Sequence, residues 1–143
     1  RSPSRGLGDV YKRQVVYRRC LFVVREIKRV QDAVVALENQ DFKKLGELMF
    51  ATHNGLSKNY EVSCEELDFL ADAVRNDENV LGARMMGGGF GGCTINLVKK
   101  DAVDGIIERV AKEYKEKFNI KLEAYKIKIS KGTSVYKNEH AGI

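Results

Sequence analysis

LGARMMGGGFGGCTINLV, residues 81–98, is the stretch that decides the fold. It holds an apolar run, then a loop with five glycines in six positions, then a second apolar run. The β-branched, alternating residues of the second run predict a strand, so the segment is predicted to be two strands joined by a glycine loop. Glycine loses the most backbone freedom on folding, so such a loop suits positive φ angles or a close approach of another group. The exposed N–H groups of a turn also form a natural site for an anion. The loop consists of Gly87, Gly88, Gly89, Phe90, Gly91 and Gly92.

The glycine spacing formally matches a dinucleotide-binding fingerprint, but its context does not. G-x-G-x-x-G requires a helix to open at the last glycine, with the pyrophosphate at its N-terminus. A predicted strand follows here instead. The flap of a protein kinase would fit strand, loop and strand, yet the chain contains no Val-Ala-Ile-Lys strand and no His-Arg-Asp loop. Both interpretations are therefore rejected.

Residues 82–93, GARMMGGGFGGC, resemble the third conserved motif of the GHMP small-molecule kinases, in the form that galactokinases carry. Phe90 among the glycines is the galactokinase feature, since mevalonate and homoserine kinases tend to have a small residue there. Residues 60–68, YEVSCEELD, and residues 49–56 resemble the segments that precede this motif. The resemblance covers roughly residues 17 to 136. One departure is Met86, where galactokinases usually have threonine and its hydroxyl.

The resemblance implies an α+β fold, a small ferredoxin-like antiparallel sheet with helices packed on one face. It implies transfer of a phosphoryl group from ATP, with Mg²⁺, to the C1 hydroxyl of galactose. Residues 87–92 would lie beside the nucleotide phosphates and the sugar. Arg84 would reach a phosphate or make a surface salt bridge, and Phe90 would pack on a ligand or fill a seam between domains.

The remaining parts that phosphoryl transfer needs are expected elsewhere. In the family, the phosphate loop, the catalytic aspartate and its arginine partner lie in an N-terminal domain, and no G-x-x-x-x-G-K-[ST] or Gly-Leu-Ser-Ser-Ser segment occurs here. We therefore expect a C-terminal kinase fragment with no catalytic residue and no metal ligand of its own, inactive alone and partnered by that domain. Two alternatives stay open: a kinase of N-acetylgalactosamine or arabinose, and a stand-alone ferredoxin-like regulatory or ligand-binding module.

Composition limits the class of protein that this chain can be. The 143 residues suffice for one domain with a core. The three cysteines form no C-x-x-C pair, and neither a signal peptide nor an 18-residue apolar run is found, so a cytoplasmic protein without a membrane partner is expected. Residues 1–14, RSPSRGLGDVYKRQ, resemble adapter sequence, and we expect a non-native or disordered leader before a domain at 15–143. This leader contributes +3 of the net charge of +5, so nucleic-acid binding is not expected.

Spacing predicts four helices. A 4-3 apolar repeat predicts a long first helix packed on its own domain, with a coiled coil as the less favoured alternative. Asp41 is the expected N-cap of a second helix, which carries His53 as a hydrogen-bonded structural residue rather than a metal ligand. Ser63 and Asp101 are expected to cap the third and fourth helices. The repeat comprises Val16, Cys20, Val23, Ile27, Val30, Val34 and Leu37.

After the fourth helix, which Asn119 is expected to stop, residues 122–130 alternate apolar and polar side chains. This alternation predicts a half-buried strand, and a short strand is expected at Val135 and Tyr136.

Overall fold

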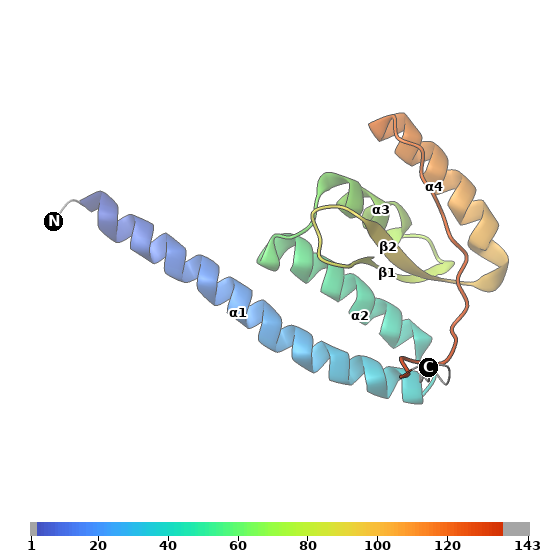
Figure 1. Ribbon diagram of the computed structural model, residues 1–143, viewed down its shortest axis with the longest axis horizontal. Helices are drawn as coiled ribbons and strands as arrows, with labels where there is room; N and C mark the ends of the chain where they lie inside the picture. The colour runs from blue at the N-terminus through green and yellow to red at the C-terminus, as the bar shows by residue number, and fades with distance from the viewer. Residues whose placement is uncertain (1–2, 136–143) are drawn as a thin grey trace, which may run out of the picture.

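The computed structural model describes residues 3–135 and contains helices around one β-hairpin (Figure 1). The helices α1 and α2 come first, followed by a π-helical turn η1, α3, the two strands, a 3-10 turn η2 and α4. The bounds are α1 Pro3–Glu38, α2 Phe42–Gly55, η1 Leu56–Tyr60, α3 Glu65–Arg75, β1 Val80–Met86, β2 Cys93–Val98, η2 Lys100–Ala102 and α4 Val103–Phe118.

The predicted hairpin is confirmed. Strands β1 and β2 pair antiparallel, with Met86 opposite Cys93 next to the loop and Val80 opposite Val98 at the far end. The register shifts between Val80 and Gly82. The six residues 87–92 thus connect two paired strands, and no helix opens at the last glycine, which agrees with the rejection of a dinucleotide fingerprint.

Helix α2 packs directly against the backbone of β1. A Cβ built on Gly46 would lie 1.8 Å from the carbonyl oxygen of Leu81, and one built on Gly82 would lie 2.5 Å from the Cα of Gly46. Only glycine permits this approach, so the Gly46–Gly82 contact fixes how close helix and strand lie. Helices α3 and α4 share a core with β1. That core consists of Leu70, Val74, Val80, Ala83, Val110 and Tyr114.

The predicted α+β class is confirmed, but the sheet is smaller than expected. Within residues 3–135 it has two strands, and residues 122–130 form no strand. Instead they run extended from the end of α4, with Tyr125, Ile127 and Ile129 between 74% and 98% exposed. An alternating segment becomes a strand only when it pairs with a neighbouring edge, and residues 122–130 pair with none in the described part of the chain. Val135 is also outside any strand, and Tyr136 lies outside the described residues.

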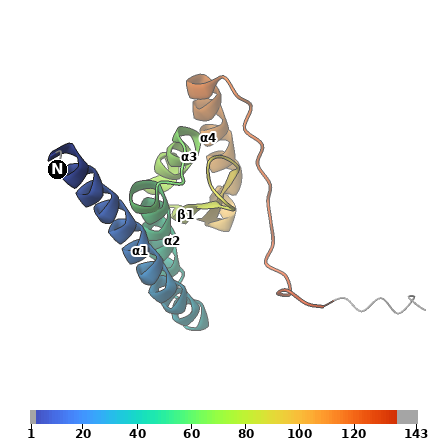
Figure 2. The same ribbon diagram turned by 60° about the vertical axis from the view of Figure 1, so that its left-hand side comes forward.

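Helix α1 departs from the sequence expectations at its start and in the exposure of its apolar repeat. It begins at Pro3, so residues 3–14 are helical rather than disordered; whether they are foreign to the protein stays a prediction. Its apolar repeat is exposed: Val16 is 61% and Ile27 is 59% accessible, and all seven members are exposed. Figures 1 and 2 show α1 running beside α2 while its first half extends past the rest of the molecule.

The reason for the exposed repeat is that α1 turns another face toward α2. Phe22 is buried against Gly55, and its ring packs at a tilt against Tyr60, with 5.3 Å between ring centroids. Glu26 accepts a hydrogen bond of 2.7 Å from the hydroxyl of Thr52 on α2. The predicted packing of the helix on its own domain is confirmed, but Phe22 and Glu26 make the contact and the repeat does not. Spacing identifies an apolar stripe but not what covers it.

The capping predictions have mixed outcomes. Asp41 caps α2 by accepting the amide of Lys44 at 2.9 Å, as predicted, and Asn119 ends α4 at a φ of 56°. Ser63 does not cap α3: the N-cap is Cys64, and the Ser63 hydroxyl donates to Asp68 instead. Asp101 lies in η2, because one 3-10 turn precedes α4 and moves its N-cap to Ala102.

Candidate functional site

The glycine loop adopts a conformation that most residues would resist. Gly87, Gly89, Gly91 and Gly92 have φ angles of 90°, 85°, 138° and 106°. Phe90 has a φ of 60°, an uncommon value for a bulky side chain, and its ring is 75% exposed. An exposed aromatic residue held in a strained conformation is typical of functional loops.

One point of the loop is held tightly. The amide of Phe90 donates to the carbonyl oxygen of Val62 at 2.7 Å. At Gly89, an added Cβ would lie 2.2 Å from that same oxygen, so a side chain has no room there. The loop is therefore fastened to the segment between η1 and α3, which the sequence resemblance included without indicating a contact.

The rest of the loop is open. A Cβ built on Gly87, Gly88 or Gly91 would meet no heavy atom within 4 Å. Gly88 is informative because its φ is not positive either, so neither the fold nor the turn requires glycine there. Absent side chains leave the peptide at Gly87 and Gly88 accessible.

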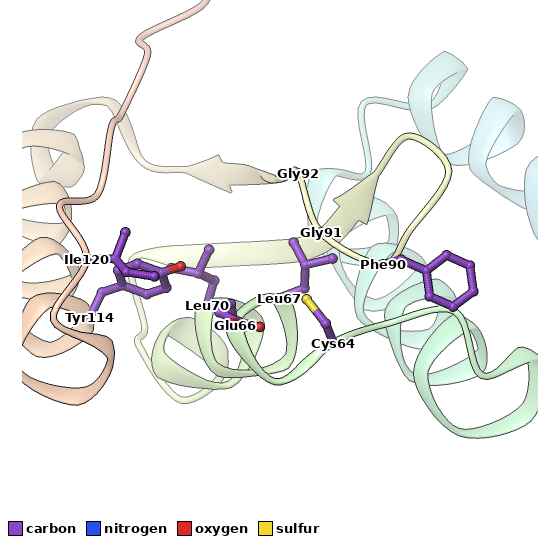
Figure 3. A pocket seen from close by; sticks show the side chains of 9 residues that line it. All are labelled: Cys64, Glu66, Leu67, Leu70, Phe90, Gly91, Gly92, Tyr114 and Ile120. Atoms are coloured by element: carbon purple, nitrogen blue, oxygen red, sulfur yellow. The ribbon is translucent and has the colours of Figure 1, made fainter.

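A hollow of about 210 Å³ lies between the loop and the helices α3 and α4 (Figure 3). In Figure 3 the sulfur of Cys64 points toward the loop at Gly91, while the Phe90 ring lies at the opposite end from Tyr114 and Ile120. The residues that line it are Cys64, Glu66, Leu67, Leu70, Phe90, Gly91, Gly92, Tyr114 and Ile120.

The electrostatics distinguish the hollow from the open side of the loop. Hydrogen bonds from its own amide and from the Cys64 thiol lower the pKa of Glu66, so the hollow contains an ionised carboxylate. None of the lining residues is a lysine or arginine. An anion is therefore disfavoured in the hollow. Arg84, on β1, donates to the carbonyl oxygen of Met85 at 3.2 Å.

No metal centre is formed by the residues described. Within residues 3–135, no three His, Cys, Asp or Glu side chains are grouped so that they could hold an ion. The three cysteines are free, with Cys20 and Cys93 exposed. No helix in this part of the chain combines the length and hydropathy that a membrane crossing requires.

His53 is confirmed as a hydrogen-bonded structural histidine. Its Nδ1 accepts the amide of Met85 at 3.1 Å, and its Nε2 lies 3.1 Å from Oδ1 of Asp68. The Asp68 carboxylate also accepts hydrogen bonds from the hydroxyl groups of Ser57 and Ser63, at 2.9 Å and 2.7 Å. Sequence reasoning missed Asp68, because its partners lie on elements whose contacts no spacing rule reveals.

Comparison with known proteins places this geometry in a family. The family model "GHMP kinases C terminal" matches residues 33–116, more than half of the chain. The galactokinase of Thermotoga petrophila is 47% identical over 115 residues, which are 80% of this chain and 33% of that protein. The galactokinase of Clostridium beijerinckii is 43% identical over 116 residues, 81% of this chain and 30% of that protein.

Solved structures agree. The galactokinase of Lactococcus lactis complexed with galactose superposes with a TM-score of 0.72 at 38% identity, covering 75% of this chain and 28% of that one. The mevalonate kinase of L. major, in complex with R-mevalonate, gives 0.56 at 28% identity over 79% and 35%. The chain thus spans about a third of the length of the curated relatives it matches. It belongs to the GHMP kinases, whose C-terminal domain it carries.

Proposed function

We propose that this chain is the C-terminal part of a galactokinase, an enzyme that transfers the γ-phosphoryl group of ATP to the C1 hydroxyl of galactose. The observation that carries the proposal is the glycine loop that stands open at Gly88, in a chain 47% identical to a galactokinase. The lower identity and TM-score of the mevalonate kinase favour a sugar over mevalonate as the acceptor.

The loop would form one wall of the reaction site. Phosphoryl transfer depends mainly on positioning and on charge stabilisation around the phosphates. Rigid backbone amides supply both, since they need no reorganisation as charge develops. Gly87 and Gly88 would face the phosphates or the acceptor sugar, and Gly89 with Phe90 would hold the loop against Val62.

Mg²⁺ would neutralise phosphate charge when bound, but the described residues do not fit it. They offer no cluster of carboxylate, histidine or cysteine ligands beside the loop. We propose that the metal, most contacts to ATP and the catalytic residues belong to the preceding part of the longer protein. This chain would then contribute the loop and its support, and no catalytic side chain.

The exposed face of α1 supports such a partner. Its members Val16 to Val30 precede the start of the family match at residue 33, and they are apolar yet exposed. Contiguous exposed apolar surface usually marks an interface. We propose that the N-terminal domain of the longer protein covers this face.

The three free cysteines are compatible with a protein of the reducing cytoplasm.

Two enzyme assays test the proposed function. The purified chain alone should show no phosphorylation of galactose, because it lacks the partner domain. A chimera in which residues 15–143 replace the matching C-terminal third of the Thermotoga petrophila galactokinase should phosphorylate galactose. The control is the Thermotoga galactokinase with its C-terminal third removed and nothing added in its place, and it should be inactive.

Two outcomes would contradict the proposal. Turnover by the isolated chain, free of contaminating kinase, would show that it carries its own catalytic residues. A chimera that folds but has no activity with galactose would show that residues 15–143 do not serve as a galactokinase C-terminal domain. N-acetylgalactosamine and arabinose belong in the same assay, because a related sugar is the remaining alternative.

A further inference from the structure

His53 joins three elements at a fully buried position. It lies on α2, its side chain is 2% exposed, and its Nδ1 accepts the amide of Met85 on β1 at 3.1 Å. Its Nε2 lies 3.1 Å from the carboxylate of Asp68 on α3. An Nδ1 that accepts an N–H carries no proton, so the proton of the neutral ring is on Nε2 and points to Asp68.

Asp68 is kept ionised as the acceptor for that proton. Burial alone would raise the pKa of Asp68, but hydrogen bonds from Ser63 and Ser57 and the nearby His53 and Lys58 outweigh it, and the pKa is lowered. A charged acceptor strengthens the hydrogen bonds it receives. His53 and both serine hydroxyls are therefore held in one orientation.

Both attachments of the glycine loop lead to this network. Met85, held by His53, is two residues before Gly87, and its side chain lies under Gly89. Val62, which holds the amide of Phe90, directly precedes Ser63, which donates to Asp68 at 2.7 Å. The incoming strand and the middle of the loop are thus fixed to one carboxylate from two sides.

We propose that His53 and Asp68 are positioning residues for the glycine loop, with His53 effective only as the neutral ring. A proton added to Nδ1 would face the N–H of Met85, and that hydrogen bond would be lost. The loop would then keep only its attachment at Val62. The relevance of these residues to catalysis rests on the proposed function, but their effect on the position of the loop does not depend on it.

The direction of the pH effect follows from the surroundings of the ring. Burial lowers the pKa of His53 below its ordinary value of 6.5; Asp68 and Asp72 oppose this and Arg75 adds to it, all three on α3. Strand β1 meets the ring with an uncharged amide. The unfolded chain therefore binds the proton more readily than the folded chain. The stability that neutral His53 contributes is complete above pH 6.5 and is lost as the pH falls through the lower pKa of the folded state.

The test is an NMR titration of the 143-residue chain from about pH 8 to about pH 5, the range in which histidine titrates. In the wild type, the amide signals of Met85 and of residues 87–92 should shift together with the His53 ring. In His53→Asn, whose Oδ1 can still accept the Met85 amide, they should not titrate. In His53→Ala at high pH, protection of the Met85 amide from hydrogen exchange should fall about tenfold, and the loop signals should move.

Thr52→Val is the matched control, since it removes the part-buried hydrogen bond from Thr52 to Glu26 on α1, at the position next to His53 in the sequence. It should leave protection of Met85 and the loop signals as in the wild type. If His53→Ala does not fold, the wild-type titration and His53→Asn decide. The proposal is overturned if the amide signals of the loop do not shift as His53 titrates. It is also overturned if a folded His53→Ala variant keeps full protection of the Met85 amide from hydrogen exchange. No ATP or galactose is used, so a failed kinase assay would not affect the result.

Discussion

Gly46→Ala is expected to lower the free energy of unfolding by about 3 kcal/mol and the melting temperature by roughly 10 °C. The added Cβ would lie 1.8 Å from the carbonyl oxygen of Leu81 and 2.3 Å from its carbon. These are backbone atoms of β1, which cannot rotate away as a flexible side chain would. Helix α2 must therefore move off the strand and take His53 with it. Thermal unfolding followed by circular dichroism measures the effect.

Gly105→Ala is the matched control on α4. A Cβ there would meet no atom within 4 Å, and the position lies in the first turn of the helix. Alanine should stabilise the chain by about 0.5–1 kcal/mol, because glycine is the poorer helix former. The same substitution thus has opposite signs at the two sites. A loss of less than about 1 kcal/mol for Gly46→Ala would contradict direct packing of α2 on the backbone of β1.

Gly89→Ala is expected to reduce kcat/KM of the galactokinase chimera on the order of 100-fold. The new Cβ would lie 2.2 Å from the carbonyl oxygen of Val62, at a φ of 85°. The loop must then leave Val62, and a displacement of about 1 Å in a reacting group can cost 100-fold in rate. Steady-state assays with galactose and ATP measure the loss.

Gly92→Ala separates the effect of backbone strain at a positive φ from the effect of losing the contact with Val62. Its φ of 106° imposes a similar backbone penalty, but its nearest neighbour to a Cβ is the oxygen of Met86 at 3.9 Å. It should lose less activity than Gly89→Ala at comparable stability. Equal losses in the two variants would show that backbone strain, and not the attachment to Val62, sets the position of the loop.

The sequence was informative where local rules decide the structure. The hairpin at 81–98, the N-cap at Asp41 and the end of α4 at Asn119 each depend on residues within a few positions. The glycine loop was found for the same reason, since five glycines exceed what a tight turn needs.

The errors arose where distant parts of the chain decide. The alternation of residues 122–130 could not reveal whether a strand edge would accept them. The α1 repeat could not reveal that Phe22 and Glu26 would face α2 instead. One error was local: Ser63 was expected to cap α3, but the helix begins one residue later, with Cys64 at its N-cap, and the Ser63 hydroxyl donates to Asp68. The support of the loop by Val62 and His53 depends on such distant contacts and gave no sequence signal.

The central claim is that the glycine loop lets a ligand contact bare backbone, and Gly88 tests it most directly. Neither its φ nor any neighbouring atom requires glycine, so Gly88→Ala and Gly88→Val should leave the melting temperature of the chimera within about 2 °C. If a phosphate or sugar approaches the peptide there, kcat/KM should fall on the order of 10-fold for alanine and further for valine. Unchanged kcat/KM in a folded Gly88→Val chimera would contradict the claim.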